Sequence, residues 1–349
     1  MNQATLLAAD DLPERIEDVD ALEEFLSRPT PGLIDDLGGL DGDIMVLGVG
    51  GKVGPCLART AKRAAPGKRV VGVARFTDPE VRRRLESWDV ETIACDFLDR
   101  DAVAALPKIE NLIFMAGRKF GTTGDEPFTW MMNTHVPGTI AENFARSRIV
   151  AFSTLCVYPF APVSPLECDE STPPGPIGEY ANSCVGRERM LQYFSKLNGT
   201  PGRLIRLNYA IDLRYGVLHD VAKWVRDGEP IDLATGHANV IWHGDVNNQV
   251  LRALAHCETP MSPLNVGAPE PTRIRALAGI FGERFGRQPI FENAESETAW
   301  VNRTDLAQSL FGPPVVPLDR MVDWVTDWIE RGLPSYQKPT RYQVRHGRF

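Results

Sequence analysis

The sequence of 349 residues lacks the excess of positive charge that a general nucleic-acid-binding protein needs, because its formal net charge is −8 at pH 7. It also lacks any apolar run close to the roughly 20 residues that a membrane-spanning helix requires. Its acidic N-terminus shows no basic segment followed by an apolar one, the pattern of a secretory signal. We therefore expect a cytoplasmic protein that binds neither nucleic acid nor membranes.

The cysteines do not form a recognisable metal or disulfide pattern. The six of them include no CxxC pair and no cluster with histidine at the spacing of zinc ligands. They lie singly in apolar segments, as buried free thiols do. This distribution predicts a reducing compartment and no metal site.

Short apolar strands alternate with segments of helical periodicity between Asp43 and Leu207. The expected strands are 44–47, 69–74, 92–95, 111–115, 149–153 and 203–207. Such alternation predicts an α/β fold, with a doubly wound parallel sheet covered by helices on both faces. We predict three regions: an N-terminal helical appendage (1–40), a Rossmann dinucleotide-binding domain (41–208), and a smaller mixed α/β substrate-binding lobe (209–349). Short segments of that lobe could return to the Rossmann domain.

A glycine-rich loop follows the first of these strands and precedes a helix. Gly48, Gly51 and Gly54 have the spacing GxxGxxG, and Gly50 adds a fourth glycine. Glycines allow the tight turn, the close approach of the backbone to a pyrophosphate, and the close packing of helix on strand. The amide groups of the helix N-terminus then face the anion. The predicted contacts of a nicotinamide dinucleotide are Gly48, Gly50, Gly51, Lys52, Val53 and Gly54.

The end of the second strand reports on the choice between NAD and NADP. A carboxylate there binds the ribose hydroxyls of NAD, whereas a basic residue accommodates the 2′-phosphate of NADP. The chain has Arg75 at this place and no carboxylate before Asp78. Arg75 therefore favours NADP, and NAD remains the alternative.

Further motifs follow the later strands in a characteristic order. They are Asp96-Phe97-Leu98-Asp99, Ala116-Gly117, Asn133 with Gly138-Thr139, Ser153 to Tyr158, and Arg206-Leu207-Asn208. In this order, from about Asp43 to about Ile329, the sequence resembles the extended short-chain dehydrogenase/reductase family, the NAD-dependent epimerase/dehydratase group.

The resemblance implies roles for several of these residues. Asp96, Phe97, Ala116 and Gly117 would contact the cofactor. Thr154 would polarise a substrate carbonyl, and Asn133 and Asn208 would belong to the substrate site. In the family, a Gly-Pro follows the asparagine that corresponds to Asn208. That Gly-Pro is absent here, which counts against the binding of a nucleotide sugar.

The chain departs from the family at the catalytic motif YxxxK. Tyr180 is placed as the family's tyrosine, but position 184 is Cys184 instead of lysine. Residues i and i+4 share one face of a helix, and an ammonium group there would lower the tyrosine pKa from its reference near 10. A neutral thiol does not do this. Cys184 has two interpretations: an inert residue packed beside the cofactor, or a reactive thiol with a lowered pKa.

Other cations near Tyr180 in the chain could replace the lysine. Arg187 lies at i+7 on roughly the same helical face, about 10 Å further along the axis. Its alternative role is to pair with Glu188 or solvent. Lys119 and Arg118, in the loop after the fourth strand, could supply positive charge or bind an anionic substrate, or could be solvated surface residues.

Three functions remain open at this point. The first is an NAD(P)-dependent oxidoreductase or epimerase that acts on a sugar-like or other small carbonyl or hydroxyl substrate, with Tyr180 as acid/base. The second is a catalytically weak or inactive dinucleotide-binding protein with a sensing or assembly role. The third is a non-redox lyase or isomerase. The resemblance also implies that the chain could form a homodimer.

Overall fold

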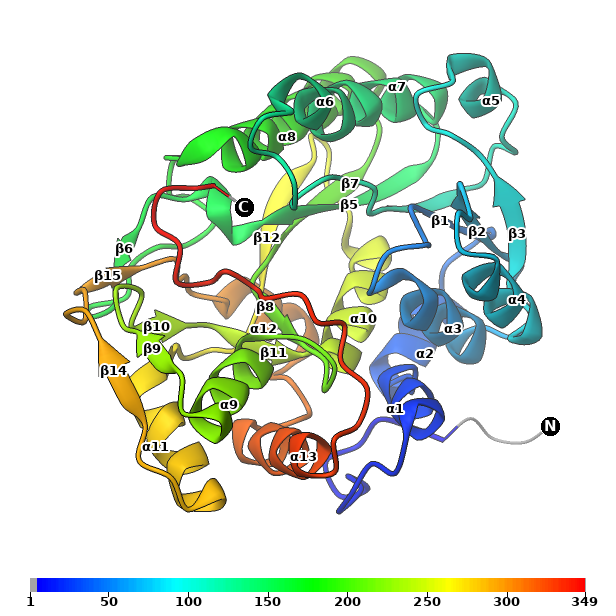
Figure 1. The fold of residues 1–349 in the computed structure, drawn as a ribbon. Coiled ribbons are helices and arrows are strands. Elements are labelled where there is room, and N and C mark those ends of the chain that lie inside the picture. Colours follow the sequence, from blue (N-terminus) through cyan, green and yellow to red (C-terminus); the bar gives the residue numbers. More distant parts are fainter. Residues whose placement is uncertain (1–4, 349) are drawn as a thin grey trace.

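The computed structural model describes residues 5–348, and its centre is a seven-stranded parallel sheet (Figure 1). In spatial order the strands are β12 (Ser262–Val266), β7 (Gly202–Leu207), β5 (Arg148–Thr154), β4 (Asn111–Phe114), β1 (Ile44–Leu47), β2 (Val70–Ala74) and β3 (Glu91–Ala94). Every neighbouring pair is parallel. From β1 the chain adds β2 and β3 on one side, and then continues with β4 on the other side of β1. Ligands of such sheets bind at the carboxyl ends of the strands, beside the point where the strand order reverses. The predicted doubly wound fold is confirmed.

Helices cover both faces of the sheet because its strands are apolar on both sides. Ile44 and Val46 of β1 belong to the core on one face, whereas Met45 and Leu47 belong to the core on the other. The first face carries α2 (Pro31–Gly38), α3 (Gly54–Ala64) and α10 (His243–Arg252). The second carries α5 (Arg100–Ala104), α7 (Val136–Asn143) and α8 (Gly178–Asn198). The helix α4 (Pro79–Ser87) lies between β2 and β3 in the chain.

The helical segment from Glu126 to Asn143, between β4 and β5, is divided into three parts. It consists of α6 (Glu126–Trp130), a π-helical turn (Met131–His135) and α7. Single π-helical turns inside helices occur frequently at functional sites. The turn here contains Asn133, whose side chain is fully buried.

The second lobe is built mainly from the chain after β7. Its helices are α9 (Val217–Asp227), α11 (Ile274–Phe285) and α13 (Leu318–Glu330), which share one core. The helix α12 (Asp305–Phe311) packs instead on the first face of the main sheet. Its strand pairs are β8 (Tyr209–Ile211) with β11 (Val240–Trp242), β9 (Pro230–Asp232) with β14 (Ile290–Glu292), and β10 (His237–Ala238) with β13 (Thr272–Arg273). A further pair, β6 (Ala161–Pro162) with β15 (Thr298–Ala299), joins the two parts of the chain. From this same region, β12 returns to the edge of the main sheet.

The N-terminal residues pack against both parts of the molecule. In α1 (Val19–Leu26), the ring of Phe25 lies 5.7 Å from that of Trp242 and 5.2 Å from that of Trp324, between centroids. Leu33 of α2 lies in the core under the sheet. The N-terminal helices therefore contribute to both cores. Within residues 5–348, none of the helices is both long and apolar enough to span a bilayer.

Candidate active site

The glycine loop forms a tight turn between β1 and α3. Gly48 has a φ of 93°, and a Cβ atom there would lie 2.6 Å from the backbone nitrogen of Ala116. A Cβ atom at Gly54 would collide with the carbonyl of Val49. Both positions therefore need glycine, the first for its conformation and the second for the packing of α3 on the loop.

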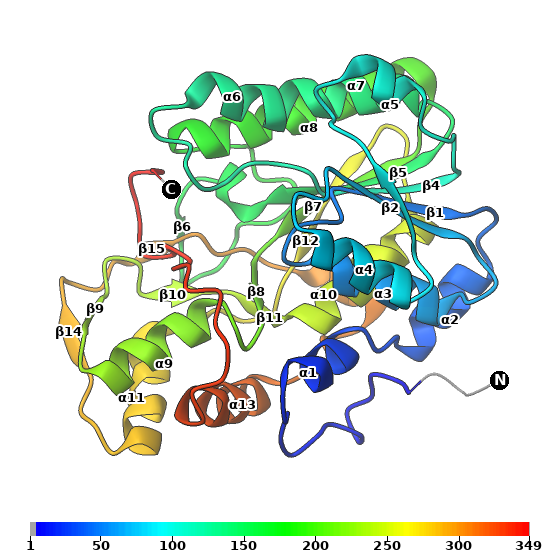
Figure 2. The ribbon, with the colours of Figure 1, turned by 45° about the vertical axis from the view of Figure 1, so that its right-hand side comes forward.

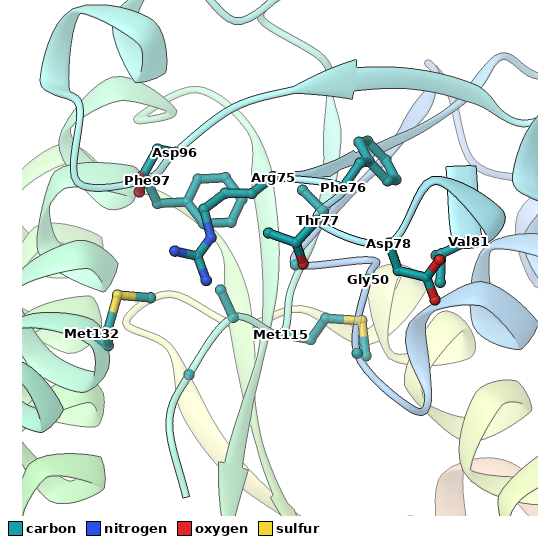
Figure 3. Close-up of a pocket in the computed structure, with 15 residues that line it drawn as sticks. Gly50, Arg75, Phe76, Thr77, Asp78, Val81, Asp96, Phe97, Met115 and Met132 are labelled. Atoms are coloured by element: carbon teal, nitrogen blue, oxygen red, sulfur yellow. The ribbon is translucent and has the colours of Figure 1, made fainter. Parts of the chain in front are cut away.

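A cavity of about 250 Å³ opens beside this loop at the carboxyl ends of the strands (Figure 3). Its lining includes eight residues that the sequence assigned to a cofactor: Gly48, Gly50, Gly51, Arg75, Asp96, Phe97, Ala116 and Gly117. It also includes residues that the sequence did not single out: Ala74, Phe76, Thr77, Asp78, Val81, Met115 and Met132. Met132 belongs to the π-helical turn, which no sequence motif predicts.

Arg75 lies at the end of β2 where the sequence placed it, and Figure 3 shows its guanidinium pointing into the cavity. Asp78 also lines the cavity, but its Oδ1 accepts a hydrogen bond of 2.9 Å from Glu80 N and caps α4. The nearest carboxylate after β2 is thus engaged at a helix end, and Arg75 is the charged side chain that faces the cavity from this strand.

Lys52 turns away from the lining of the cavity. Its Nζ lies 3.5 Å from the ring centroid of Tyr215, at the start of the second lobe, and 5.1 Å from that of Phe120. Burial, together with the positive charges of Lys338 and Lys119, lowers its pKa to about 8. Lys119 lies 5.5 Å from the same Phe120 ring, and burial lowers its pKa also. Both ammonium groups therefore lie near the Phe120 ring, outside the lining of the cavity.

Thr154 and Tyr180 meet at the carboxyl end of β5. Thr154 is the last residue of the strand, and its Oγ1 accepts a hydrogen bond of 3.2 Å from Cys156 N. Tyr180 is in the first turn of α8. Burial raises the pKa of Tyr180 well above its usual value near 10, while the charge of Arg187 and a hydrogen bond with Thr154 lower it in part. The two hydroxyl groups can thus act on one substrate oxygen.

Cys184 lies one turn after Tyr180 and is 1% exposed. Burial raises the pKa of its thiol to about 11, although the charge of Arg187 lowers it. At neutral pH such a thiol is protonated, and it lacks the lowered pKa of a reactive cysteine. The geometry therefore favours the interpretation of Cys184 as a packed, inert residue.

Arg187 is 5% exposed, and its guanidinium lies beside the loop that follows β4. It donates hydrogen bonds to the carbonyl of Phe152 at 2.7 Å and to Asn133 Oδ1 at 2.9 Å. A Cβ atom at Gly117 would collide with its Nη2. Among residues 5–348, no carboxylate lies within ion-pair distance of Arg187. The adjacent Glu188 pairs with Arg206 instead. Arg187 is thus a buried cation held by neutral oxygens beside the cavity.

The two asparagines assigned to the substrate have different surroundings. Asn133 holds the loop after β4, since its Oδ1 accepts from Arg118 N at 2.7 Å and its Nδ2 donates to the Arg118 carbonyl at 2.8 Å. Asn208 donates to Asn302 Oδ1 at 2.8 Å, while its own buried Oδ1 has no hydrogen-bond partner among the described residues. Asn133 is therefore engaged by the protein, whereas Asn208 retains a free acceptor.

The family model described as "NAD dependent epimerase/dehydratase family" matches residues 44–258, which is more than half of the chain. The chain belongs to the NAD-dependent epimerase/dehydratase family. This match confirms the resemblance and the expectation of an enzyme of the epimerase/dehydratase type. A comparison with the sequences of curated proteins finds no match.

Solved structures of epimerases share the fold. UDP-glucuronic acid 4-epimerase from Bacillus cereus, in complex with UDP-glucuronic acid and NAD, is 19% identical with a TM-score of 0.68, over 83% of this chain and 99% of its own. UDP-glucose 4-epimerase from Thermotoga maritima, with UDP-glucose, is 17% identical with a TM-score of 0.69, over the same shares of the two chains. A UDP-galactose 4-epimerase is 22% identical with a TM-score of 0.66, again over 83% and 99%.

Proposed function

We propose that this protein is an NAD(P)-dependent oxidoreductase or epimerase that acts on a sugar-like or other small substrate with a carbonyl or hydroxyl group. The observation that carries the proposal is the meeting of Tyr180 and Thr154 at the carboxyl end of β5, on the edge of the parallel sheet where the glycine-lined cavity opens. A positioned proton donor and a second hydroxyl on the same oxygen are what carbonyl reduction and its reverse need.

The cavity fits a nicotinamide dinucleotide. At Gly48 the backbone passes so close to Ala116 that a Cβ atom would collide with it, and the N-terminus of α3 follows the same loop. Gly48, Gly50 and Gly51 would hold the pyrophosphate, Asp96 and Phe97 the adenine, and Arg75 the 2′-position of the ribose. When bound, the dinucleotide would accept or donate a hydride.

The chain's own residues would move the proton. Tyr180 holds its proton firmly at neutral pH because burial raises its pKa, so it would donate to a substrate oxygen held by Thr154. In the reverse direction the deprotonated Tyr180 would take the proton back from the substrate hydroxyl, and the raised pKa makes this deprotonated form costly at neutral pH. Arg187 lowers the pKa of Tyr180 from its place on the same helix, and would take over part of the electrostatic role of the missing lysine.

The substrate would lie between the lobes, against residues that the cofactor cavity does not use. Lys119 and Lys52, which both lie near the Phe120 ring, would supply positive charge to it, and the free Oδ1 of Asn208 would accept a hydrogen bond from a hydroxyl group. The structural neighbours crystallised with UDP-sugars support a sugar-like substrate. Homodimerisation remains a prediction.

One observation favours a second function, a weak or inactive dinucleotide-binding protein. Cys184 occupies the lysine position with a protonated thiol, so that Tyr180 is less acidic than a YxxxK motif would make it. In that case cofactor binding would persist without turnover.

A single-turnover experiment separates these two functions. The protein is loaded with NADPH or NADH, binding is measured by the cofactor's fluorescence, and a panel of free and UDP-linked keto-sugars is screened for loss of absorbance. We expect turnover with at least one compound, and a fall of at least 100-fold in Tyr180→Phe with unchanged cofactor binding. The matched control is Tyr193→Phe on the exposed side of the same helix. Tight binding without any turnover would support the second function instead.

A further inference from the structure

Residues 331–348, which follow α13, contain neither helix nor strand and cross from the second lobe to the beginning of α8 (Figures 1 and 2). In both views this part, drawn in red, rises from α13 along the front of the molecule. We call residues 340–348 the C-terminal segment.

Hydrogen bonds fix the C-terminal segment to the second lobe. Thr340 donates through its N and Oγ1 to Asp220 Oδ2, at 2.8 and 2.6 Å. Arg345 donates to the carbonyl and the Oγ1 of Thr298, at 2.7 and 2.8 Å. Between them, Tyr342 is buried, with its ring 6.1 Å from that of Trp224. The segment is therefore anchored from α9 to β15, as an ordered part of the lobe.

The end of the segment is seated on the first turn of α8 through two glycines. Gly178 and Gly347 have φ values of 81° and 69°, in the left-handed region that favours glycine. A Cβ atom at Gly178 would collide with the carbonyl of Gly347, and one at Gly347 would collide with the carbonyl of Ile177. The contact is thus backbone against backbone, two residues before Tyr180.

Between the anchors and this seat, the segment covers the surroundings of Tyr180. Val344 packs against the small core of Leu155, Cys156, Ala181 and Trp300, the same core that Tyr180 and Tyr209 pack against. The next side chain, Arg345, places its guanidinium 3.8 Å from the ring centroid of Phe160, which borders this core as well. The C-terminal segment therefore packs against the same small core as the predicted acid/base group.

We propose that the C-terminal segment is one wall of the substrate site, and that it restricts the site to small substrates without a nucleotide. Val344 is the specificity-determining side chain of this wall, because it packs against the same small core as Tyr180. The inference rests on the proposed function in that Tyr180 marks the reacting centre. Because the segment is held at Asp220, Thr298 and Gly178, it would keep the nucleotide of a larger substrate out of the volume that it fills beside this core.

The first test uses thiol accessibility and requires neither cofactor nor substrate. Three proteins are compared with the wild type: one lacking residues 344–349, Gly347→Val, which disturbs the seat but keeps the anchors, and Arg348→Ala, whose side chain is exposed. Each is treated with N-ethylmaleimide, and the labelling rate of every cysteine is followed by peptide mass spectrometry. Cys156 lies in the core under Val344, whereas Cys56 in α3 belongs to a different core and reports on unfolding.

We expect labelling of Cys156 to be at least tenfold faster in the truncated protein and in Gly347→Val, with Cys56 unchanged and Arg348→Ala like the wild type. If truncation also accelerates Cys56, Gly347→Val decides alone. Equal labelling of Cys156 in the wild type and in Gly347→Val would overturn the inference, because the segment would then not cover the site.

The second test measures substrate size. UDP-glucose is titrated calorimetrically into the wild type and the truncated protein, both saturated with NADPH. We expect binding at least tenfold tighter to the truncated protein, and equally tight binding to both would overturn the size restriction. Failure of the proposed function would appear elsewhere, as absent turnover or an inert Tyr180→Phe substitution, while the thiol result would stand.

Discussion

Arg187 donates through Nη2 to Asn133 Oδ1 at 2.9 Å, and this bond joins α8 to the π-helical turn below the cavity. The guanidinium has no carboxylate partner in residues 5–348, although burying an unpaired charge is costly. The same group exerts the main electrostatic effect that lowers the pKa of both Tyr180 and Cys184. Strongly perturbed ionisable groups of this kind concentrate at functional sites, so we assign Arg187 an electrostatic role.

Replacing Arg187 with methionine should raise the pKa of Tyr180 further, because the nearby positive charge disappears. In the direction that takes a proton from the substrate, the rising limb of the kcat–pH profile should move to higher pH by about one unit, equivalent to about 1.4 kcal/mol. Arg187→Lys keeps the charge and should retain most of the profile. The profiles, with cofactor affinity measured alongside, check the assignment, and a limb that stays in place in Arg187→Met refutes it.

Arg75 should determine the preference between the two dinucleotides. Its guanidinium points into the cavity, and the nearest carboxylate, Asp78, caps α4. Arg75→Ala should weaken NADPH binding by about tenfold or more, since a charge-assisted hydrogen bond contributes about 1.5–3 kcal/mol. NADH binding should hardly change. Arg83→Ala, which removes an exposed arginine paired with Glu80, is the control, and an equal loss for both cofactors would show that Arg75 does not read the 2′-phosphate.

Much of the site could be predicted from the sequence, either from local patterns or from the resemblance to the family. The loop from Gly48 to Gly54 follows from the spacing of glycines between a strand and a helix. The pairing of Thr154 with Tyr180 follows from the resemblance to the family, because no local pattern joins two residues so far apart in the chain. For the glycine loop, neighbouring residues carry the information.

Other features depend on residues far apart in the chain and were not predicted. The glycine-loop pattern predicts that Lys52 contacts the pyrophosphate, but its Nζ lies against the ring of Tyr215 in the second lobe. The C-terminal segment carries no motif. It contacts the start of α8 through two glycines, Gly178 and Gly347, that are far apart in the sequence. The π-helical turn at Asn133 lies inside an unbroken helical pattern, so periodicity did not reveal it.

The buried pair of Glu188 and Arg206 should be essential for stability. Glu188 is 0% and Arg206 3% exposed, and the guanidinium donates to both carboxylate oxygens at 2.7 and 3.1 Å. Glu188→Gln leaves the cation buried without its partner, which should lower the free energy of unfolding by about 3–5 kcal/mol.

Denaturant unfolding of Glu188→Gln, Arg206→Met and the double variant forms a thermodynamic cycle for this pair. The double variant should recover part of the loss, because no unpaired charge remains. Equal destabilisation by the single substitution and the double one would mean that the loss comes from packing.

His219 should make the protein less stable at acidic pH. It lies in α9, it is 7% exposed, and burial lowers its pKa to about 4. In the unfolded chain its pKa is near 6.5, so the folded state favours the neutral ring. The stabilisation is fully present above about pH 6.5 and is lost as pH falls toward 4, to a total of about 3 kcal/mol.

His219→Gln cannot titrate, and its unfolding free energy should therefore fall less steeply over this window. His346→Gln, at an exposed site in the C-terminal segment, should keep the wild-type slope. Chemical denaturation at half-unit steps from pH 4 to 7.5 measures the three slopes, and parallel curves for the wild type and His219→Gln would show that the buried ring is not the source.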